Sequence, residues 1–278
     1  MDDLEDDLLA STVSGTVTAA VDGTCVEVAY LRRPGSGQTL VCLHGFGSTK
    51  EDYADLALHP AFRGRDLVLL DAPGFGASRV DRPDRLSIPF LVDVVAAVCD
   101  DLGIERFHLS GHSMGGLTAL LFCRVHRDRV VSFVDIEGNL APEDCFLSRQ
   151  ILDHPAESPD AFLDGFIQRV GERSEYASRL YASTIRAKVR PTSVEPIFVS
   201  MVDLSDNHQL MRIMADLPMP RLFIHGEQNR HLSYLGHLPA IGVEVAEIPF
   251  AGHFPMYSNP TALWSVIDTF LTDVEAAS

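Results

Sequence analysis

Basic residues are scarce in this sequence. It holds 22 Lys and Arg against 39 Asp and Glu, a formal net charge of −17 at pH 7. A nucleic-acid partner needs a basic surface that neutralises backbone phosphates, so this balance argues against one. Hydrophobic residues make up 46% and charged residues 22% of the chain, which is ordinary for a soluble globular protein.

Long apolar runs and a basic leader are also missing. No apolar stretch approaches the length of a membrane span, which argues against a membrane partner. The segment of residues 1–7 is rich in Asp and Glu, where a signal peptide would be basic. We expect residues 1 to about 12 to form a solvated acidic segment and the protein to be cytoplasmic.

The cysteines are few and scattered along the chain. The chain has five cysteines, an odd number, and no two of them have the spacing of metal ligands. We interpret them as reduced core residues and expect no metal site. They are Cys25, Cys42, Cys99, Cys123 and Cys145.

Alternating strand and helix patterns fill most of the chain. Two early strands flank Asp22-Gly23, a hairpin signal. Residues 40–43, 67–70, 106–109 and 130–136 are predicted strands, mostly apolar as in parallel sheets buried on both faces. Ser87 begins a predicted helix and Asn259 another, each followed by a proline in the first turn. The alternation predicts an α/β protein with a mostly parallel sheet and helices on both faces.

The alternation stops between residues 140 and 217 and then resumes. This stretch has helical patterns at 161–170, 175–188 and 197–203, separated by prolines, and no comparable strand. A length of 278 residues suits one large α/β domain with an insertion. We therefore expect a core domain of residues 1–139 and 218–278 and a helical cap of residues 140–217.

Gly111-His112-Ser113-Met114-Gly115 lies between a predicted strand and a predicted helix. This Gly-x-Ser-x-Gly arrangement predicts a nucleophile elbow, a tight turn that strains Ser113 and lifts its hydroxyl clear of the sheet. The Met114 N–H, at the start of the helix, would then face a developing oxyanion. The loop after the 40–43 strand makes the Phe46 N–H the natural second donor.

A serine nucleophile needs a base that takes its proton and a third group that holds the base. Among the histidines of the sequence, His253 fits best, because it follows the last predicted strand in a glycine-flanked turn. An exposed loop histidine without a role is the alternative.

The chain resembles the α/β-hydrolase-fold superfamily, in its lipase and esterase branch. The matching segments occur in the family's order: His44-Gly45-Phe46-Gly47, Asp71-Ala72-Pro73-Gly74-Phe75-Gly76, Gly111 to Gly116, and Gly252-His253-Phe254-Pro255. The resemblance implies an eight-stranded sheet, a helical cap between strands six and seven, a Ser–acid–His triad and no cofactor. Branches with an aspartate nucleophile, the dehalogenases and epoxide hydrolases, are excluded by Ser113.

The acid departs from the commonest family pattern. Many members place an aspartate in a Gly-Glu-x-Asp turn after strand seven, but this turn ends in Asn229, which is uncharged. Some members, including haloalkane dehalogenases and zearalenone lactone hydrolases, place a carboxylate directly after strand six, where Glu137 stands. We expect Glu137 to orient His253, in preference to Asn229, Glu227 or Asp135, because its partner should balance an imidazolium charge.

The predicted function is a serine hydrolase that cleaves a carboxylic ester or a lactone of a medium-sized, partly apolar small molecule. Another reaction on the same triad (C–C bond hydrolysis, amide hydrolysis or acyl transfer) stays open, as does a ligand-binding member with little turnover. A homo-oligomer also stays open. The cap residues expected either to line the pocket or to pack its helices together are Phe146, Phe162, Phe166, Met201 and Met211.

Overall fold

The computed structural model describes residues 12–277. The acidic segment predicted at the N-terminus therefore lies almost wholly outside the described residues. Within them, no helix has both the length and the apolar character needed to cross a membrane.

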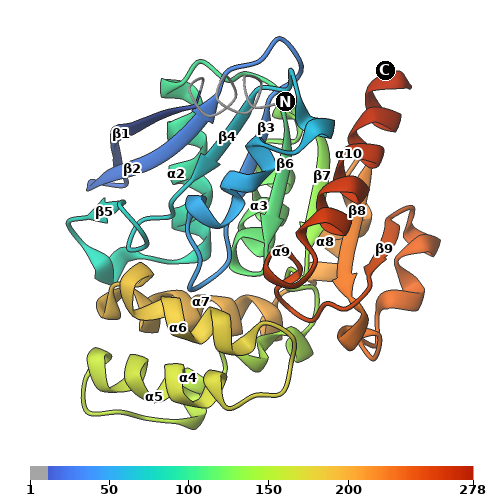
Figure 1. Ribbon diagram of the computed structural model, residues 1–278. Coiled ribbons are helices and arrows are strands. Elements are labelled where there is room, and N and C mark those ends of the chain that lie inside the picture. Colours follow the sequence, from blue (N-terminus) through green and yellow to red (C-terminus); the bar gives the residue numbers. More distant parts are fainter. Residues whose placement is uncertain (1–11, 278) are drawn as a thin grey trace.

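One twisted sheet runs through the molecule (Figure 1). Its main path has the order β1-β2-β4-β3-β6-β7-β8-β9, and the short β5 pairs with β2 beside this path. β1 and β2 are antiparallel to their neighbours, and the remaining strands of the path are parallel. The eight strands of the main path agree with the expected eight-stranded sheet. The strands are β1 (Val13–Val21), β2 (Thr24–Arg33), β3 (Leu40–Leu43), β4 (Leu67–Leu70), β5 (Arg79–Val80), β6 (Phe107–His112), β7 (Val130–Ile136), β8 (Arg221–Gly226) and β9 (Glu244–Ile248).

Local sequence signals explain how the first two strands connect. Val21 pairs with Thr24, so Asp22 and Gly23 form a two-residue turn. Both turn residues have positive φ, 46° and 72°, as this turn type requires. The hairpin prediction is confirmed.

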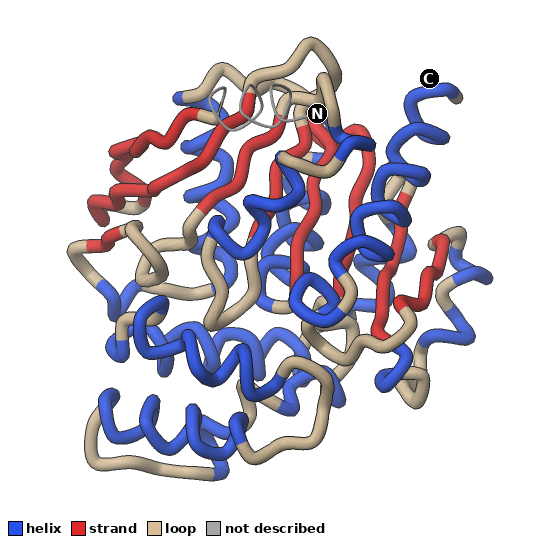
Figure 2. The backbone as a smooth tube through the Cα atoms, viewed as in Figure 1, coloured by secondary structure: helices blue, strands red, loops and turns tan. Residues whose placement is uncertain are grey.

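Helices cover both faces of the sheet, with α10 (Pro260–Ala276) and the 3₁₀ helix η1 (Lys50–Ala57) on one face, and α2 (Ile88–Asp101) and α3 (Met114–Val125) on the other (Figures 1 and 2). The Ser87 hydroxyl caps α2 by accepting from the Phe90 N–H at 3.2 Å. Apolar side chains from both helical layers pack against the strands and form one continuous core.

The stretch between β7 and β8 is helical, and no strand occurs among its residues, all of which the structure describes. Figure 1 shows α4–α7 beyond the carboxyl ends of the parallel strands, whereas α8 packs against α3. The predicted helices at 161–170, 175–188 and 197–203 correspond to α5, α6 and α7, and the sequence analysis missed α4 and α8. The elements are η5 (Pro142–Phe146), α4 (Gln150–Asp153), α5 (Pro159–Gly171), α6 (Ser178–Lys188), η6 (Pro191–Ser193), α7 (Val194–Asn207) and α8 (Leu210–Asp216).

The loop after β4 depends on a buried ion pair. The Asp71 carboxylate accepts the backbone N–H groups of Lys50 (2.8 Å) and Ala77 (2.9 Å), and it pairs with the Lys50 ammonium at 2.7 Å. These donors satisfy a fully buried carboxylate, which is why it can remain in the interior. The loop from β4 is thereby tied to η1.

All five cysteines are free. Four of them are buried, as predicted, but Cys25 is exposed. The prediction that they are core residues is therefore wrong for Cys25, because alternate side chains of the edge hairpin face solvent.

Candidate active site

Ser113 stands in a strained turn between β6 and α3. Its φ is +50° and its ψ is −114°, a conformation that side-chain-bearing residues rarely adopt. A Cβ on Gly111 would overlap the Gly115 carbonyl, and one on Gly115 would overlap the backbone of Leu43. The glycines of the elbow are thus required by close backbone approach, as the sequence pattern predicts.

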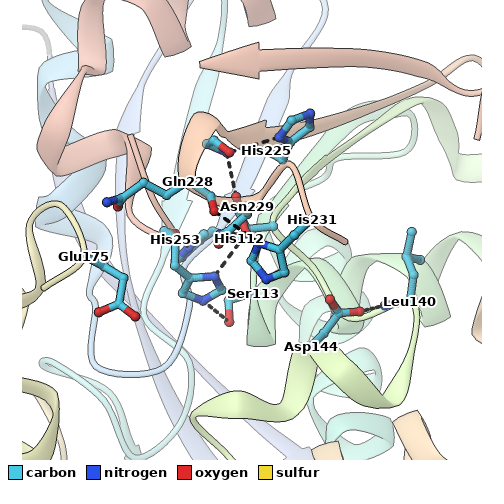
Figure 3. A network of polar contacts seen from close by, with 12 residues as sticks. His112, Ser113, Leu140, Asp144, Glu175, His225, Gln228, Asn229, His231 and His253 are labelled. Atoms are coloured by element: carbon cyan, nitrogen blue, oxygen red, sulfur yellow. Dashed lines mark hydrogen bonds and ion pairs between the residues drawn. The ribbon is translucent and has the colours of Figure 1, made fainter. Parts of the chain in front are cut away.

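His253 reaches the serine from the loop between β9 and α9 (Pro255–Ser258). Its Nε2 atom lies 3.0 Å from the Ser113 Oγ atom, as the dashed line in Figure 3 shows. Both side chains are buried. This distance is within hydrogen-bond reach, so the imidazole can take the hydroxyl proton.

Glu137 lies directly after β7 and faces the other nitrogen of the same ring. Its Oε2 atom is 3.3 Å from His253 Nδ1. The Gly226 N–H donates to Oε1 at 2.6 Å, and the Asn229 amide donates to Oε2 at 2.8 Å. Glu137 has a φ of +53°, a second left-handed residue in the same site. Ser113, His253 and Glu137 thus form a hydrogen-bonded row, and the backbone adopts uncommon conformations at both of its ends, Ser113 and Glu137.

The other acids that the sequence offered lie elsewhere. Asp135 is fully buried, and its Oδ1 atom lies so close to Gly116 and Gly138 that a Cβ on either glycine would overlap it. The Glu227 carboxylate accepts the Phe250 N–H at 2.9 Å. The structure thus brings Ser113, His253 and Glu137 together and leaves Asp135 and Glu227 out of hydrogen-bond contact with the histidine.

Burial dominates the electrostatics of the row. It lowers the pKa of His253 to about 3, with a further lowering by the Arg173 charge that Glu175 opposes. Burial raises the pKa of Glu137 to about 7, against the two hydrogen bonds from Gly226 and Asn229. His253 is consequently neutral at pH 7, the state in which it can accept a proton. The ionisation of Glu137 falls near neutral pH.

One expected oxyanion donor lies within the elbow, and the other lies in the loop after β3. Met114 is the first residue of α3, so its N–H has no acceptor within the helix. The Phe46 N–H makes no hydrogen bond within residues 12–277. Its loop and the elbow are close, because a Cβ on Gly115 would also meet the His44 carbonyl oxygen.

The sequence analysis assigned no role to two residues of this site. Asn229, rejected there as an acid, is a donor to the acid. His112 is buried beside Ser113, and its Nε2 lies 2.7 Å from the carbonyl oxygen of His253. For Asn229, the available signal was its place in the turn where relatives carry an aspartate. For His112, the signal was its adjacency to the nucleophile.

A pocket of about 500 Å³ opens on the acid side of the row. Figure 3 shows Glu175 on one side of the His253 ring in this view, with His231 and Asp144 on the other. The Phe146 ring stands edge-on to His253 with centroids 4.9 Å apart, and the Arg173 guanidinium lies 5.0 Å from the Phe146 ring centre. The pocket combines apolar walls, such as Leu147 and Leu232, with charged and amide groups.

Among the residues of the predicted cap that were expected either to line the pocket or to pack its helices together, Phe146 lines this pocket. Phe162, Phe166 and Met201 are buried in the core instead, and Met211 packs against it. Phe166 and Phe198 contact the ring of Phe46, with centroids 5.6 and 4.2 Å apart. Aromatic packing therefore fills the side of the site that carries Phe46.

Within residues 12–277, no group of three or more His, Cys, Asp or Glu side chains is arranged to hold a metal ion. The buried polar atoms of the row are satisfied by one another and by Gly226 and Asn229.

Comparison with known proteins places the chain in a family. Residues 38–178, which include the elbow and the strand before it, match the α/β hydrolase fold. The chain is a member of the α/β hydrolase family. A solved esterase from Thermogutta terrifontis has the same fold, with a TM-score of 0.74 and 22% identity over 94% of this chain and 99% of that one.

Two curated relatives of this α/β hydrolase are named for different reactions. It is 26% identical over 249 residues to 2-succinyl-6-hydroxy-2,4-cyclohexadiene-1-carboxylate synthase of Pectobacterium atrosepticum, covering 84% of this chain and 93% of the relative. It is 34% identical over 194 residues to pimeloyl-[acyl-carrier protein] methyl ester esterase of Aeromonas hydrophila, covering 69% of this chain and 66% of the relative. The family thus contains both an esterase and a synthase.

The buried carboxyls predict how stability depends on pH. Burial raises the pKa values of Glu137 and Asp144 to about 7, from 4.5 and 3.8. The folded protein therefore binds more protons than the unfolded chain between these values. The stability that each group contributes is full below its unfolded pKa and is lost as pH rises through about 7.

We expect the ionisation of these two carboxyl groups to lower the free energy of unfolding between pH 5 and pH 8, as measured by urea denaturation. In Glu137→Gln the decrease should shrink by on the order of 3 kcal/mol, since one pKa unit corresponds to about 1.4 kcal/mol. An identical pH slope in the wild type and Glu137→Gln would contradict the raised pKa.

Proposed function

We propose that this α/β hydrolase is a serine hydrolase that cleaves a carboxylic ester or a lactone through a Ser113–His253–Glu137 triad. The observation that carries the proposal is the buried row from Ser113 Oγ through His253 to Glu137, at 3.0 and 3.3 Å. A strained nucleophile, a neutral base and a carboxylate behind the base are the three groups that acyl transfer to serine requires.

In the proposed first half-reaction, His253 Nε2 removes the hydroxyl proton as Ser113 Oγ attacks the carbonyl carbon. The carbonyl oxygen becomes an oxyanion that accepts from the Phe46 and Met114 N–H groups, with the N-terminal end of α3 favouring its charge. The Glu137 carboxylate balances the imidazolium that has formed. His253 then gives the proton to the leaving oxygen, and an acyl group remains on Ser113.

The second half-reaction repeats these roles with water. His253 takes a proton from water as the water oxygen attacks the acyl carbon, and it returns the proton to Ser113 Oγ as the ester bond to serine breaks. The carboxylic acid leaves and the free enzyme is restored. With a lactone, the leaving oxygen stays attached to the acyl chain and departs only at this step.

We further propose that residues 140–217 act as a cap that encloses the substrate. The helices α4–α7 lie over the carboxyl ends of the strands (Figure 1), where the triad also lies. The pocket of about 500 Å³ suits a medium-sized molecule, and its mixture of Phe146 and Leu147 with Arg173 and Asn229 suits a partly apolar one. Because aromatic rings fill the Phe46 side, the substrate would extend toward Glu137.

A different reaction on the same triad is the second candidate. One relative, matched over 46% of this chain, is named 2-hydroxy-6-oxononadienedioate/2-hydroxy-6-oxononatrienedioate hydrolase, and the relative matched over 84% of this chain is named a synthase, not an esterase. Breakage of a C–C bond would need the same base but a substrate whose carbanion is stabilised by its own carbonyl groups. A panel of substrates separates these reactions directly.

Turnover on a panel of short acyl esters, lactones, amides and β-diketones tests the proposal. We expect measurable hydrolysis of esters or lactones, and loss of at least about 10³-fold in kcat with Ser113→Ala, since the triad acts as a unit. Circular dichroism should show that the variant is folded. Hydrolysis retained within tenfold by folded Ser113→Ala would refute the serine mechanism, and turnover of β-diketones alone would favour the second candidate.

The acid is tested by two matched substitutions. Glu137→Gln should lower kcat by about 10²–10⁴, in the range of triad-acid losses. Glu227→Gln serves as the control, because that carboxylate binds Phe250 in a neighbouring loop, and its rate should stay near that of the wild type. The assignment of Glu137 is wrong if Glu227→Gln is inactive while Glu137→Gln retains its rate.

Asn229→Ala should change the pH profile more than the maximum rate. Activity requires ionised Glu137, so kcat/KM should rise with pH through about 7, the pKa of that carboxyl. Removing the Asn229 donor destabilises the ionised form, which moves this acidic limb to higher pH. A limb that stays in place would show that Glu137 does not control it.

A further inference from the structure

We propose that Tyr181, on helix α6 of the cap, is a positioning residue. It holds the Phe46 oxyanion donor and the His253 loop in fixed positions relative to each other. The proposal rests on the serine-hydrolase function above. It makes the cap part of the catalytic apparatus as well as a cover over the substrate.

The Tyr181 hydroxyl binds the oxyanion loop directly. It donates to the carbonyl oxygen of Phe46 at 2.7 Å, across 135 residues of sequence. The side chain is fully buried, so water does not compete for this hydrogen bond. The contact fixes the carbonyl of the same residue whose N–H is the proposed oxyanion donor.

The Phe46 loop needs such an external restraint. Phe46 lies between Gly45 and Gly47, and Gly47 has a φ of +76°. Glycine on both sides leaves the flanking dihedral angles unrestricted by a Cβ, so the position of the Phe46 N–H depends on the contacts that the Phe46 ring and carbonyl make. A Cβ on Gly47 would overlap the Tyr181 ring and hydroxyl, which shows how closely the tyrosine is seated on the loop.

The same ring supports the base. Tyr181 stacks on Phe254, with centroids 4.0 Å apart and planes 26° apart. Phe254 follows His253 in the chain, and its ring meets the imidazole nearly edge-on at 5.0 Å. One cap residue therefore contacts the oxyanion loop through its hydroxyl and the histidine loop through its ring face.

Helix α6 is attached firmly enough to serve as a support. At its last residue, the Lys188 ammonium pairs with Asp52 at 2.6 Å and lies 3.3 Å from the Tyr257 hydroxyl. The Lys188 carbonyl also accepts the Gly76 N–H at 2.8 Å. The helix is thus joined to η1 and to the loop after β4, both parts of the core.

The alternative is that Tyr181 only fills space. The two roles separate when the hydroxyl is removed and the ring is kept, because ring packing would survive and the hydrogen bond to Phe46 would not. An oxyanion donor contributes in the transition state, so its displacement should lower kcat and leave KM nearly unchanged.

We propose to compare Tyr181→Phe with Tyr53→Phe on an ester that the wild type hydrolyses. The Tyr53 hydroxyl is also buried but has no hydrogen-bond partner within residues 12–277. We expect Tyr181→Phe to lose about 10- to 100-fold in kcat, less than the loss of a whole oxyanion donor, with KM within about threefold. Tyr53→Phe should match the wild type.

Binding of two inhibitors provides the second readout. A trifluoromethyl ketone forms a tetrahedral adduct whose oxyanion uses the hole, whereas the matching methyl ketone does not. Tyr181→Phe should weaken the trifluoromethyl ketone by about the factor lost in kcat and leave the methyl ketone unaffected.

Two results would overturn the positioning role. One is a Tyr181→Phe enzyme with wild-type kcat and wild-type affinity for the trifluoromethyl ketone. The other is a loss shared equally between the two ketones, which would indicate a general packing defect. A wild type that hydrolyses no ester or lactone would instead refute the proposed function, so the two failures are distinguishable.

Discussion

A buried carboxylate links the parts of the molecule that form the candidate site. Glu137 leaves β7, and its oxygens receive hydrogen bonds from Gly226 at the end of β8 and from Asn229 in the following turn. The same carboxylate lies 3.3 Å from His253, which comes from the loop after β9. Residues at or just after the ends of β7, β8 and β9 thus meet at one carboxyl group. The donors offset part of the cost of burying an ionised carboxyl group, and they hold it beside the histidine.

The sequence predicted those features that local chemistry decides. Gly111 and Gly115 around Ser113 indicated the elbow because only a residue without Cβ fits where two backbones touch. His253 was identified by its place after the last predicted strand, since parallel strands end at one edge of a sheet. The choice of Glu137 required an argument about charge, and the structure places its carboxylate beside the ring, although its catalytic role stays a prediction.

Long-range partners could not be predicted in the same way. Asn229 was considered only as a replacement for an acid, and its role as a donor depends on β7 and β8 lying side by side. Tyr181 meets Phe46 and Phe254 because the helices between β7 and β8 lie over the sheet, an arrangement that no local sequence pattern specifies. Phe162 and Phe166 have the apolar character expected of a pocket wall, but Phe166 packs against Phe46, and Phe162 packs against Phe166 and Phe198. Apolar residues carry no signal that separates a cavity wall from a helix interface.

The central claim is that Ser113 is a nucleophile activated by His253, and covalent labelling tests it most directly. Intact-protein mass spectrometry after incubation with a fluorophosphonate at pH 8, where Glu137 is ionised, should show one phosphonyl adduct. Peptide mapping should place the adduct on Ser113, and labelling should be slowed strongly in His253→Ala. No adduct on the folded protein, or an adduct on another serine, would contradict the account.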